Sequence, residues 1–539
     1  MKFGYAFAIA LLTAQCAIAQ TPNFLWAASF GSGLETGYAA ELGRAITVDK
    51  SGNIYVAGYF NSTNALFGTN ILTTRGDFDA LVMKLDPSGN VLWARSAGGS
   101  DDDDYAYAIA VDSTGNVYVA GEFYSTNAIF SGVTVTNSSP IADSAFFLAR
   151  YDPDGNLLWV RAPDKNYTSF SDGLALDASD NIYLAATLNR TNLIGGTNLV
   201  ANADDAVILK YDPNGTLVWS KLIGGAGYEG TSAIAYAAGA IALTGTFSSQ
   251  QLQLDSVTLT NSGTSSYADI FVAKLDLDGH VLWAQSAGAP DFPDHVNALG
   301  MDQTGNVFIA GFLGSAYTRF GNLVLSNTSQ SVYLVKYSAD GTPLWARQSF
   351  GTALSQDSAE GIAIDFAGNC NLTGIFRGTN IQFGPITLTN AGPNGGLDCF
   401  ITKYDPSGNV LGAQRAGGDN VDDSLGIACD AQANCYITGF FWGSNVLYGA
   451  TALTSQYLDI FVAKLTTDQP RLSAALLGDN HLLLSWVDQP NIIIEASTNL
   501  LPSDWSPAIT GETVVVSNGI ATLPVMTTPQ QQFFRLRRN

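Results

Sequence analysis

The sequence predicts an all-β protein: a seven-bladed β-propeller with four antiparallel strands per blade, followed by a small β-sandwich. Two observations predict the propeller. A Leu-Trp or Val-Trp ending, or its degenerate copy, returns at intervals of 60 to 67 residues along most of the chain. Between successive endings the same short runs rich in Val, Ile, Tyr and Phe return in the same order. Repeats of this length that hold four strands are typical of propeller blades.

Each repeat contains four predicted strands. In the second copy, strand one ends at Asp112, strand two covers 117–121, strand three covers 147–152, and strand four ends at Trp159. Asp-x-x-Gly-Asn and Asp-Pro-x-Gly-Asn sequences follow strands one and three, and they favour tight hairpin turns. Apolar residues fall on both faces of the strands, as expected for a sheet that packs between two neighbours.

The number of copies predicts how the ring closes. The first three strands occur seven times, beginning near Arg44, Ala108, Gly173, Ala233, Ala298, Gly361 and Gly426. The seventh copy ends at Lys464-Leu465 without a fourth strand, whereas Phe24-Leu25-Trp26 is a fourth strand without its first three. Pairing the two chain ends gives seven complete blades and leaves no sheet edge open.

The repeats resemble the SBBP-type seven-bladed β-propeller repeat of secreted bacterial proteins. The resemblance covers about residues 23 to 468 and rests on Gly-Ile-Ala-Ile-Asp at 361–365, Gly-Asn-Val-Tyr-Val-Ala-Gly at 115–121 and Phe-Val-Ala-Lys-Leu-Asp at 271–276. Local departures are Asp180, Ala237 and Gly412. Phrases in 471–539, such as Phe-Phe-Arg-Leu-Arg at 533–537, are similar to a C-terminal module of exported proteins of Verrucomicrobia-like bacteria. The resemblance implies fold and compartment, and it supplies no catalytic residue.

The chain is expected to be secreted. Residues 1–19 have a short basic start, an apolar run and a small-x-small ending, which predicts a signal peptide cleaved after Ala19. The propeller is expected over 20–470 and the β-sandwich over 471–539. We expect an extracellular, periplasmic or cell-surface monomer, with no transmembrane segment in the mature chain. With 24 Lys+Arg against 47 Asp+Glu, the surface should repel nucleic acid.

An acidic residue stands eight positions before the strand-one turn in six of the seven copies. The six are Glu41, Asp104, Glu229, Asp294, Asp357 and Asp422. Because strand one is the innermost strand of a blade, these side chains are expected to ring one mouth of the central channel. They would then bind a ligand or a cation such as Ca²⁺. The alternative is that each accepts hydrogen bonds from backbone N–H groups of its own loop, and the repetition favours this structural role.

The remaining candidates are few. Cys429 and Cys435 flank one tight turn and should face each other across a hairpin, so a disulfide is plausible between them. His295 follows one of the six acids. Two interpretations of its side chain stay open: a general base in catalysis, or a solvated side chain without a catalytic role. The only other His residues, His280 and His481, lie in predicted turns, and three His leave little room for a multi-His metal centre.

The predicted function is non-catalytic. We expect a binding or scaffold module that recognises a protein or carbohydrate ligand on the face with the strand 2–3 and strand 4–1 connections. The strand 2–3 connections insert roughly fifteen to twenty residues, a length typical of functional loops. No cofactor is required, although Ca²⁺ is compatible with the acidic ring. The alternative is a polysaccharide lyase or hydrolase that uses the acidic channel mouth, which would need an asymmetric carboxylate pair.

Overall fold

The structure is a computed structural model. It describes residues 22–31, 39–139, 143–164, 168–263, 267–290, 292, 294–326, 329–352, 356–392, 396–466, 473–478, 481–487, 492–497, 506–507, 515–517, 520–526 and 533–538. The expected signal peptide, 1–19, lies outside these residues. The chain divides into two compact units, 1–467 and 468–539. Among the described residues, no helix has the length and apolar character needed to cross a bilayer.

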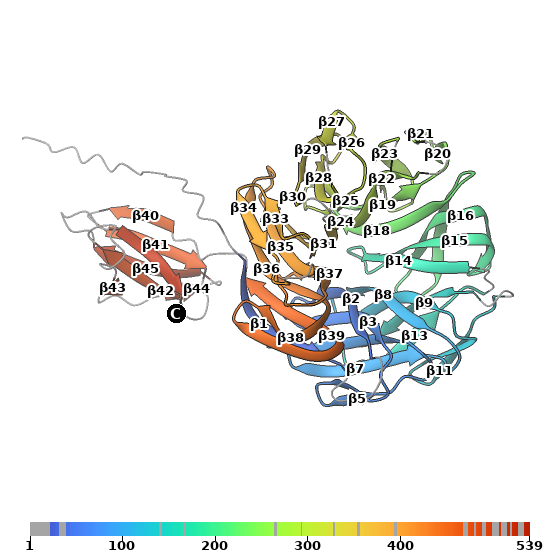
Figure 1. The fold of residues 1–539 in the computed structure, drawn as a ribbon, viewed down its shortest axis with the longest axis horizontal. Coiled ribbons are helices and arrows are strands. Elements are labelled where there is room, and N and C mark those ends of the chain that lie inside the picture. Colours follow the sequence, from blue (N-terminus) through green and yellow to red (C-terminus); the bar gives the residue numbers. More distant parts are fainter. Residues whose placement is uncertain are drawn as a thin grey trace, which may run out of the picture. The chain divides into compact units, whose positions relative to one another are not determined.

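The described part of the first unit is all-β and contains seven antiparallel sheets of one four-stranded plan (Figure 1). We number them in chain order. Sheet 1 consists of β2 (Glu41–Val48), β3 (Ile54–Phe60), β6 (Asp79–Leu85) and β7 (Val91–Gly98). Sheet 2 consists of β8 (Asp104–Val111), β9 (Val117–Phe123), β12 (Ala145–Tyr151) and β13 (Leu157–Arg161). Sheet 3 consists of β14 (Thr168–Leu176), β15 (Ile182–Ile194), β16 (Thr197–Tyr211) and β17 (Leu217–Ile223).

The other four sheets repeat this plan. Sheet 4 consists of β18 (Glu229–Ala237), β19 (Ala240–Phe247), β22 (Asp269–Leu275) and β23 (Val281–Gly288). Sheet 5 consists of β24 (His295–Met301), β25 (Val307–Leu313), β28 (Ser331–Tyr337) and β29 (Pro343–Gln348). Sheet 6 consists of β31 (Ser358–Ile364), β32 (Cys370–Phe376), β35 (Asp398–Tyr404) and β36 (Val410–Ala416). Sheet 7 consists of β37 (Asp422–Cys429), β38 (Asn434–Tyr448), β39 (Thr451–Thr466) and β1 (Asn23–Phe30).

The sheets are arranged like the blades of a propeller. The first strands of consecutive sheets lie side by side around a common centre, and β2 also lies beside β37 (Figure 1). The N-terminal strand β1 pairs antiparallel with β39, so the last sheet contains segments from both ends of this unit. The middle strands are buried along their length, as in β9 and β22. The hydrophobic core therefore lies between neighbouring sheets.

The repeated Trp of strand four joins each sheet to the next. Trp93 of sheet 1 donates its indole N–H to the carbonyl of Pro153 in sheet 2, at 3.0 Å. Four further Trp residues bond the next sheet in the same way, namely Trp159, Trp219, Trp283 and Trp345. The indole also covers a turn glycine, because a Cβ on Gly155, where φ is 78°, would lie 2.7 Å from the Trp93 ring. The Trp repeat is therefore a contact between sheets.

The tight turns are held by their own aspartates. Asp49 accepts hydrogen bonds from the N–H groups of Ser51 and Asn53 and from the Asn53 side chain. In the turn between strands three and four that begins at Asp86, the hydrogen bond from the Asn90 side chain, with the N–H donors of the turn, lowers the pKa of the Asp86 carboxyl. The acidic turn residues of the sequence thus act inside their own turns.

The long strand 2–3 connections form β-hairpins. Four such hairpins are β4–β5 (Ala65–Phe67, Asn70–Leu72), β10–β11 (Asn127–Phe130, Val133–Thr136), β20–β21 (Gln251–Leu254, Val257–Thr260) and β26–β27 (Tyr317–Phe320, Leu323–Ser326). A fifth is β33–β34 (Asn380–Phe383, Ile386–Thr389), which pairs with β30 (Phe350–Gly351). Hairpin β10–β11 pairs with β7 of the preceding sheet, and β26 pairs with β23. These two hairpins cover strand edges that would otherwise be unpaired, and the role of this face in ligand recognition stays a prediction.

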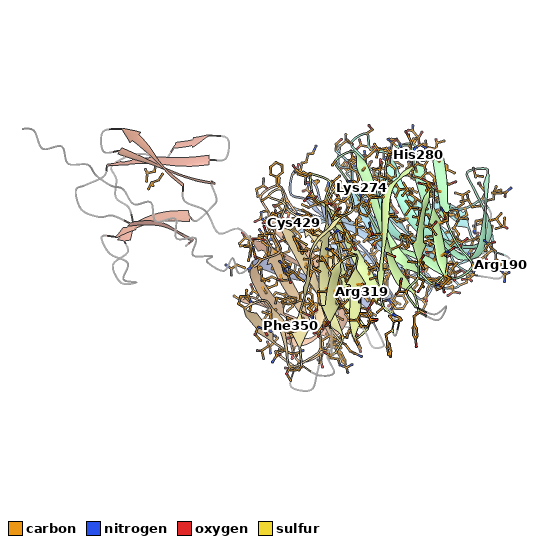
Figure 2. All side chains as sticks on the ribbon, turned by 90° about the horizontal axis from the view of Figure 1, so that it is seen from above. Arg190, Lys274, His280, Arg319, Phe350 and Cys429 are labelled. Carbon is orange, nitrogen blue, oxygen red and sulfur yellow. A yellow bond between two sulfur atoms is a disulfide. The ribbon has the colours of Figure 1, made fainter. Side chains whose placement is uncertain are left out.

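Tight turns and long connections lie at opposite ends of the first unit. In the side view of Figure 2, His280 and Cys429 at tight turns lie at one end, and Arg319 of a strand 2–3 connection and Phe350 of a strand 4–1 connection lie at the other. The second unit contains two antiparallel sheets. One consists of β40 (Ser473–Gly478), β41 (His481–Val487), β45 (Ile520–Met526) and β44 (Val515–Ser517), and the other of β43 (Ser506–Pro507), β42 (Ile492–Ser497) and β46 (Phe533–Arg538).

Candidate binding site in the central channel

Each innermost strand contains a β-bulge at the same position. In β2 the register shifts between Gly43 and Ala45, so Arg44 is the extra residue. The other six innermost strands shift at the equivalent place. A bulge leaves its extra residue unpaired and redirects the side chain. The bulged residues that line the centre are Arg44, Tyr107, Ser232, Asn297, Glu360 and Leu425.

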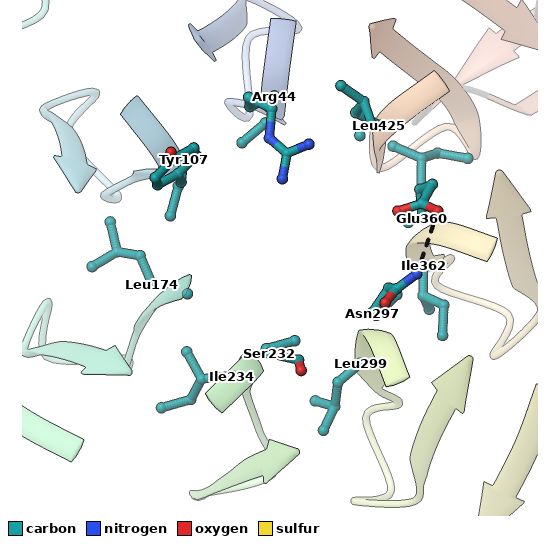
Figure 3. Close-up of a pocket in the computed structure, with 18 of the residues that line it drawn as sticks. Arg44, Tyr107, Leu174, Ser232, Ile234, Asn297, Leu299, Glu360, Ile362 and Leu425 are labelled. Atoms are coloured by element: carbon teal, nitrogen blue, oxygen red, sulfur yellow. Dashed lines mark hydrogen bonds between the residues drawn. The ribbon is translucent and has the colours of Figure 1, made fainter. Parts of the chain in front are cut away.

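These side chains point into a cavity of about 380 Å³ between the innermost strands (Figure 3). Two residues further along each strand, the lining is aliphatic in all seven: Ile46, Ile109, Leu174, Ile234, Leu299, Ile362 and Ile427. The aliphatic position keeps one chemistry in every repeat. The bulged position changes from guanidinium to phenol, hydroxyl, amide, carboxylate and alkyl group. A symmetric backbone thus presents an asymmetric set of side chains.

The charged and amide side chains of the cavity lining come from sheets 1, 5 and 6, whereas sheet 7 contributes Leu425 between them. The Asn297 amide donates to Glu360 Oε1 at 3.3 Å and to the Ser358 hydroxyl at 3.0 Å. The Arg44 guanidinium lies over the Tyr107 ring, with 5.6 Å between Cζ and the ring centroid. Within the described residues, that guanidinium makes no hydrogen bond or ion pair. Its donors therefore remain available to a ligand in the cavity.

Two neighbouring carboxyl groups have altered acidity. Burial raises the pKa of Glu360, opposed by hydrogen bonds from Ser358 and Asn297 and by the charge of Arg44. Burial also raises the pKa of Asp423 to about 7, with a further increase from the Glu360 charge and a decrease from Arg44. Near neutral pH, Asp423 therefore exists in both protonation states beside Glu360. This is an asymmetric carboxylate pair, which the six repeated acids do not provide.

An aromatic cluster lies beside the cavity on the side of the long connections. Tyr59 packs edge-on against Tyr105, with ring centroids 4.6 Å apart, and Tyr105 stacks against Tyr107 at 5.8 Å. Phe78 and Tyr124 complete the cluster. The hydroxyl of Tyr105 donates to Asp103 at 2.7 Å, and that of Tyr107 donates to Glu122 at 2.8 Å. The cluster combines apolar ring faces with oriented polar groups.

The six predicted acids do not line the cavity. All six are at most 1% exposed: Glu41, Asp104, Glu229, Asp294, Asp357 and Asp422. Each accepts hydrogen bonds from its own loops. For example, Asp104 accepts from the Gly99 N–H and the Ser125 hydroxyl, both at 2.7 Å. Their predicted place in the channel mouth is wrong, because the carboxylates turn back to satisfy loop N–H groups. Cation binding by these residues stays a prediction.

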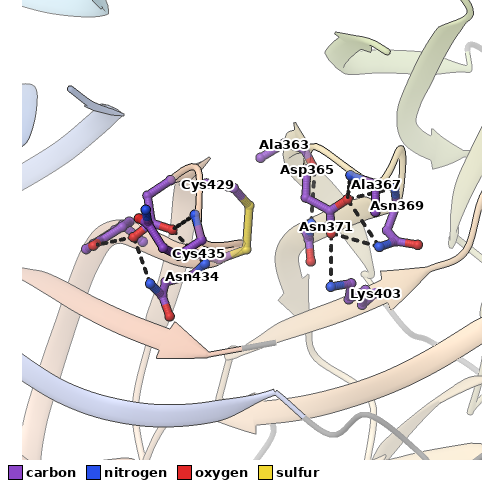
Figure 4. The surroundings of a disulfide bond; sticks show 12 residues. Ala363, Asp365, Ala367, Asn369, Asn371, Lys403, Cys429, Asn434 and Cys435 are labelled. Carbon is purple, nitrogen blue, oxygen red and sulfur yellow. Dashed lines mark hydrogen bonds and ion pairs between the residues drawn. A yellow bond between two sulfur atoms is a disulfide. The ribbon is translucent and has the colours of Figure 1, made fainter. Parts of the chain in front are cut away.

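The other sequence candidates lie away from the cavity lining. The His295 ring is exposed and stacks on Phe312, with 4.5 Å between ring centroids. Cys429 and Cys435 face each other across one turn and form a disulfide (Figure 4). Cys370 and Cys399 are buried free thiols. In the part of the chain that the structure describes, no three His, Cys, Asp or Glu side chains come together as a metal site.

Sequence reasoning missed the bulged residues. The search followed residues that recur in every copy, and recurrence identifies what each repeat needs for its own structure. The signal that could have identified them is variation at one position of the repeat, and not recurrence. Three positions after the repeated acid, the residue changes in every copy, between fixed small and aliphatic neighbours. Variation at one position of a regular repeat indicates a site that the repeat structure does not determine.

Comparison with known proteins agrees with the observed sheets. A family model described as a β-propeller repeat, SBBP, matches residues 37–65 and 92–130. An uncharacterized WD repeat-containing protein, L264, of Acanthamoeba polyphaga mimivirus is 24% identical over 65% of this chain and 31% of its own length. The chain is a propeller-repeat protein. The regulatory protein FlaEY of Caulobacter vibrioides is 31% identical to this propeller-repeat protein over 16% of the chain and 9% of its own length. The chain thus spans less than a third of either relative.

Solved structures similar to this propeller-repeat protein are distant in sequence. A protein of unknown function from Dyadobacter fermentans is 10% identical, with a TM-score of 0.39 over 83% of this chain and 99% of the other. The gluconolactonase XC5397 from Xanthomonas campestris is 14% identical, with a TM-score of 0.31 over 80% of this chain and 99% of the other.

Proposed function

We propose that this chain is a secreted or surface-associated, non-catalytic scaffold that binds a protein or glycan ligand. The seven sheets act as blades of a closed β-propeller, in which β1 is the fourth strand of the last blade. Cleavage after Ala19 and a monomeric state are part of the same proposal. The ligand enters the central channel from the face of the long connections, where the aromatic cluster lies. No cofactor is required for this function.

The bulged position supports a binding role more than any other observation. Its backbone geometry is repeated in every innermost strand, yet its side chains differ from sheet to sheet. A ligand in the cavity would meet Arg44 on one side and Glu360 with Asn297 on another, above an aliphatic ring. An apolar pocket with a few convergent polar groups is the usual form of a binding site.

Removal of the Arg44 guanidinium from the channel is expected to weaken ligand binding. The full chain is screened against arrays of glycans and of cell-surface proteins, and the affinity of each ligand found is measured for Arg44→Ala. We expect at least about a tenfold loss, equivalent to about 1.4 kcal/mol. Lys50→Ala is the matched control, because Lys50 is exposed on a tight turn. Absence of any ligand, or equal affinity of the two variants, would contradict the proposal.

The neighbouring carboxyls of Glu360 and Asp423 favour one alternative function, a carbohydrate-active lyase or hydrolase. A carboxyl with a pKa of about 7 can donate or accept a proton at neutral pH, and a second carboxyl with a different environment can take the opposite role. In this alternative the aromatic cluster would hold the sugar rings.

Catalysis by this pair predicts a sharp effect of one substitution. Purified protein is incubated with a panel of polysaccharides, and new reducing ends and unsaturated products are measured. If the alternative holds, Asp423→Asn lowers the rate by at least about a hundredfold, and Asp154→Asn on an exposed turn leaves it unchanged. Absence of product with the wild-type chain excludes the alternative and leaves the binding scaffold.

Calcium at the six repeated acids is an alternative that one melting experiment decides. Ca²⁺ that binds only the folded state would raise the melting temperature of the protein. Excess EDTA should then lower the melting temperature, and an unchanged value would exclude a structural calcium ring.

A further inference from the structure

A second repeated acid meets the first at the boundary between sheets. It is the Asp that stands five residues before the Lys of strand three, as in Asp79 and Lys84. At the boundary of sheets 1 and 2, a Cβ on Gly98 would lie 2.3 Å from Asp79 Oδ1 and 2.8 Å from Asp104 Oδ2. Both carboxylates therefore point to one place, and only a glycine fits between them.

At the boundary of sheets 7 and 1, a Cβ on Gly31 would likewise lie 2.4 Å from Asp459 Oδ1 and 2.8 Å from Glu41 Oε2, although Asp459 is only half-buried. Four other boundaries hold a pair with both members buried, and we call each of these four an interface acid pair. The pairs are Asp79 with Asp104, Asp205 with Glu229, Asp269 with Asp294, and Asp398 with Asp422. All eight side chains are at most 2% exposed. Two like charges buried together cannot both remain ionised without a positive charge between or beside them.

Two of the pairs contain carboxylate oxygens without a hydrogen-bond partner. At the boundary of sheets 3 and 4, Asp205 Oδ1 and Glu229 Oε2 have no hydrogen-bond partner. At the boundary of sheets 6 and 7, the same holds for Asp398 Oδ1 and Asp422 Oδ1. In each pair, each carboxylate has one satisfied and one unsatisfied oxygen. The Gly225 N–H lowers the pKa of both Asp205 and Glu229, but it does not satisfy Asp205 Oδ1 or Glu229 Oε2, which lack a donor or cation between them.

The backbone N–H groups around the pairs indicate whether the missing partner is a proton or a metal ion. The satisfied oxygens accept backbone N–H groups, from Asn202 to Asp205 at 3.1 Å and from Ser249 to Glu229 at 3.1 Å. Gly418 N–H donates to Asp422 at 2.7 Å. N–H donors solvate an anion and repel a metal ion, whereas Ca²⁺ needs six to eight oxygen ligands. A proton needs only the two free oxygens.

We propose that each interface acid pair binds one proton between its two carboxylates, so that neighbouring sheets are joined by a carboxyl–carboxylate hydrogen bond. The acidity of the groups agrees with this arrangement. Burial is the main cause that raises the pKa of both Asp104 and Asp422 to about 7, and the neighbouring Asp adds to it. Burial likewise raises the pKa of Asp205 and of Glu229.

Other charged groups differ between the boundaries. Asp204 adds negative charge near Asp205, and no cation acts on Asp205 or Glu229 in the described part of the chain. Arg415 lies 3.0 Å from Asp398, opposed by Asp419, and Cys399, Asp423 and Tyr448 also face that pair. Arg75 bonds Asp79 at 3.3 Å. The Asp205–Glu229 pair is therefore the cleanest one to test.

The Glu229→Gln variant distinguishes a bound proton from a bound metal ion at the Asp205–Glu229 pair. The glutamine amide supplies a permanent donor to Asp205 and replaces the bound proton, but it removes a metal ligand. Native full-length protein should show an infrared carbonyl band of protonated carboxyl groups at pH 7, and this band should lose intensity in Glu229→Gln. Asp154→Asn, on an exposed turn, should leave the band unchanged.

The pH dependence of stability gives a second readout. Because the folded pair binds a proton that the unfolded chain has lost, the wild-type melting temperature should fall as pH rises from about 4 through the raised folded pKa, which is about 7 for Asp104 and Asp422. Glu229→Gln should reduce this slope and melt above the wild type at about pH 8. An unchanged infrared band, or a wild-type melting temperature lowered by excess EDTA together with a Glu229→Gln variant destabilised at every pH, would overturn the proposal.

Discussion

Replacement of Lys403 by Met is expected to lower the free energy of unfolding by about 3–5 kcal/mol. Lys403 Nζ lies 2.9 Å from Asp365 Oδ2, and both side chains are fully buried (Figure 4). The variant keeps most of the side-chain volume but leaves the Asp365 charge without this cation. Asp365 retains hydrogen bonds from the N–H groups of Ala367 and Asn369, which only partly compensate. Urea unfolding of both proteins measures the difference.

An exposed ion pair provides the matched control. Lys221 pairs with Asp255, and these side chains are 20% and 40% exposed. Lys221→Met should therefore change the free energy of unfolding by less than about 1 kcal/mol. A loss in Lys403→Met no greater than in this control would show that the buried pair is not a major contact of sheet 6.

Deletion of residues 20–30 is expected to cost more than about 5 kcal/mol, because loss of one buried Phe or Trp already costs about 3–5 kcal/mol. The deletion removes β1, including the buried Phe30, and exposes the edge of β39. It also removes Trp26, whose ring covers Gly89 of sheet 1, where a Cβ would lie 3.0 Å from the indole. Calorimetry should show a lower or lost cooperative transition.

Removal of the second unit serves as the comparison. A chain that ends at residue 467 lacks a segment of different architecture but keeps all seven sheets. Its main transition should stay close to that of the full chain. Equal melting of the chain without residues 20–30 and the full chain would show that β1 is dispensable for the sheets.

The repeat pattern was sufficient to predict the strands, and one apparent irregularity now has a cause. Gly412 stands where the other copies have Trp. In sheets 1 to 5 the Trp bonds a carbonyl in the turn between strands three and four of the next sheet, as Trp345 bonds Pro406 at 3.1 Å. Sheet 7 has no such turn, because β39 and β1 come from opposite ends of the unit. A Trp at 412 would lack that acceptor.

The site was less predictable than the strands. Whether Asp104 faces the channel or its own loop depends on backbone N–H groups that the sequence pattern does not locate. The β-bulge at Arg44 adds one residue to the strand, and a strict alternation of faces assigns the following residues to the wrong side. The pairing of the hairpin β10–β11 with β7 was also not predicted, because it joins segments of neighbouring repeats.

A disulfide between the two ends of the first unit tests the central claim, that the sheets close into a ring around the channel, most directly. Ala27 of β1 stands opposite Ala463 of β39, so Ala27→Cys with Ala463→Cys should have the spacing of a disulfide. Ala27→Cys with Ile460→Cys places the thiols three residues out of register, about 10 Å apart along the strand. Peptide mapping under non-reducing conditions should find a linked peptide only in the first variant. No link there, or equal linkage in both, would contradict the closed ring.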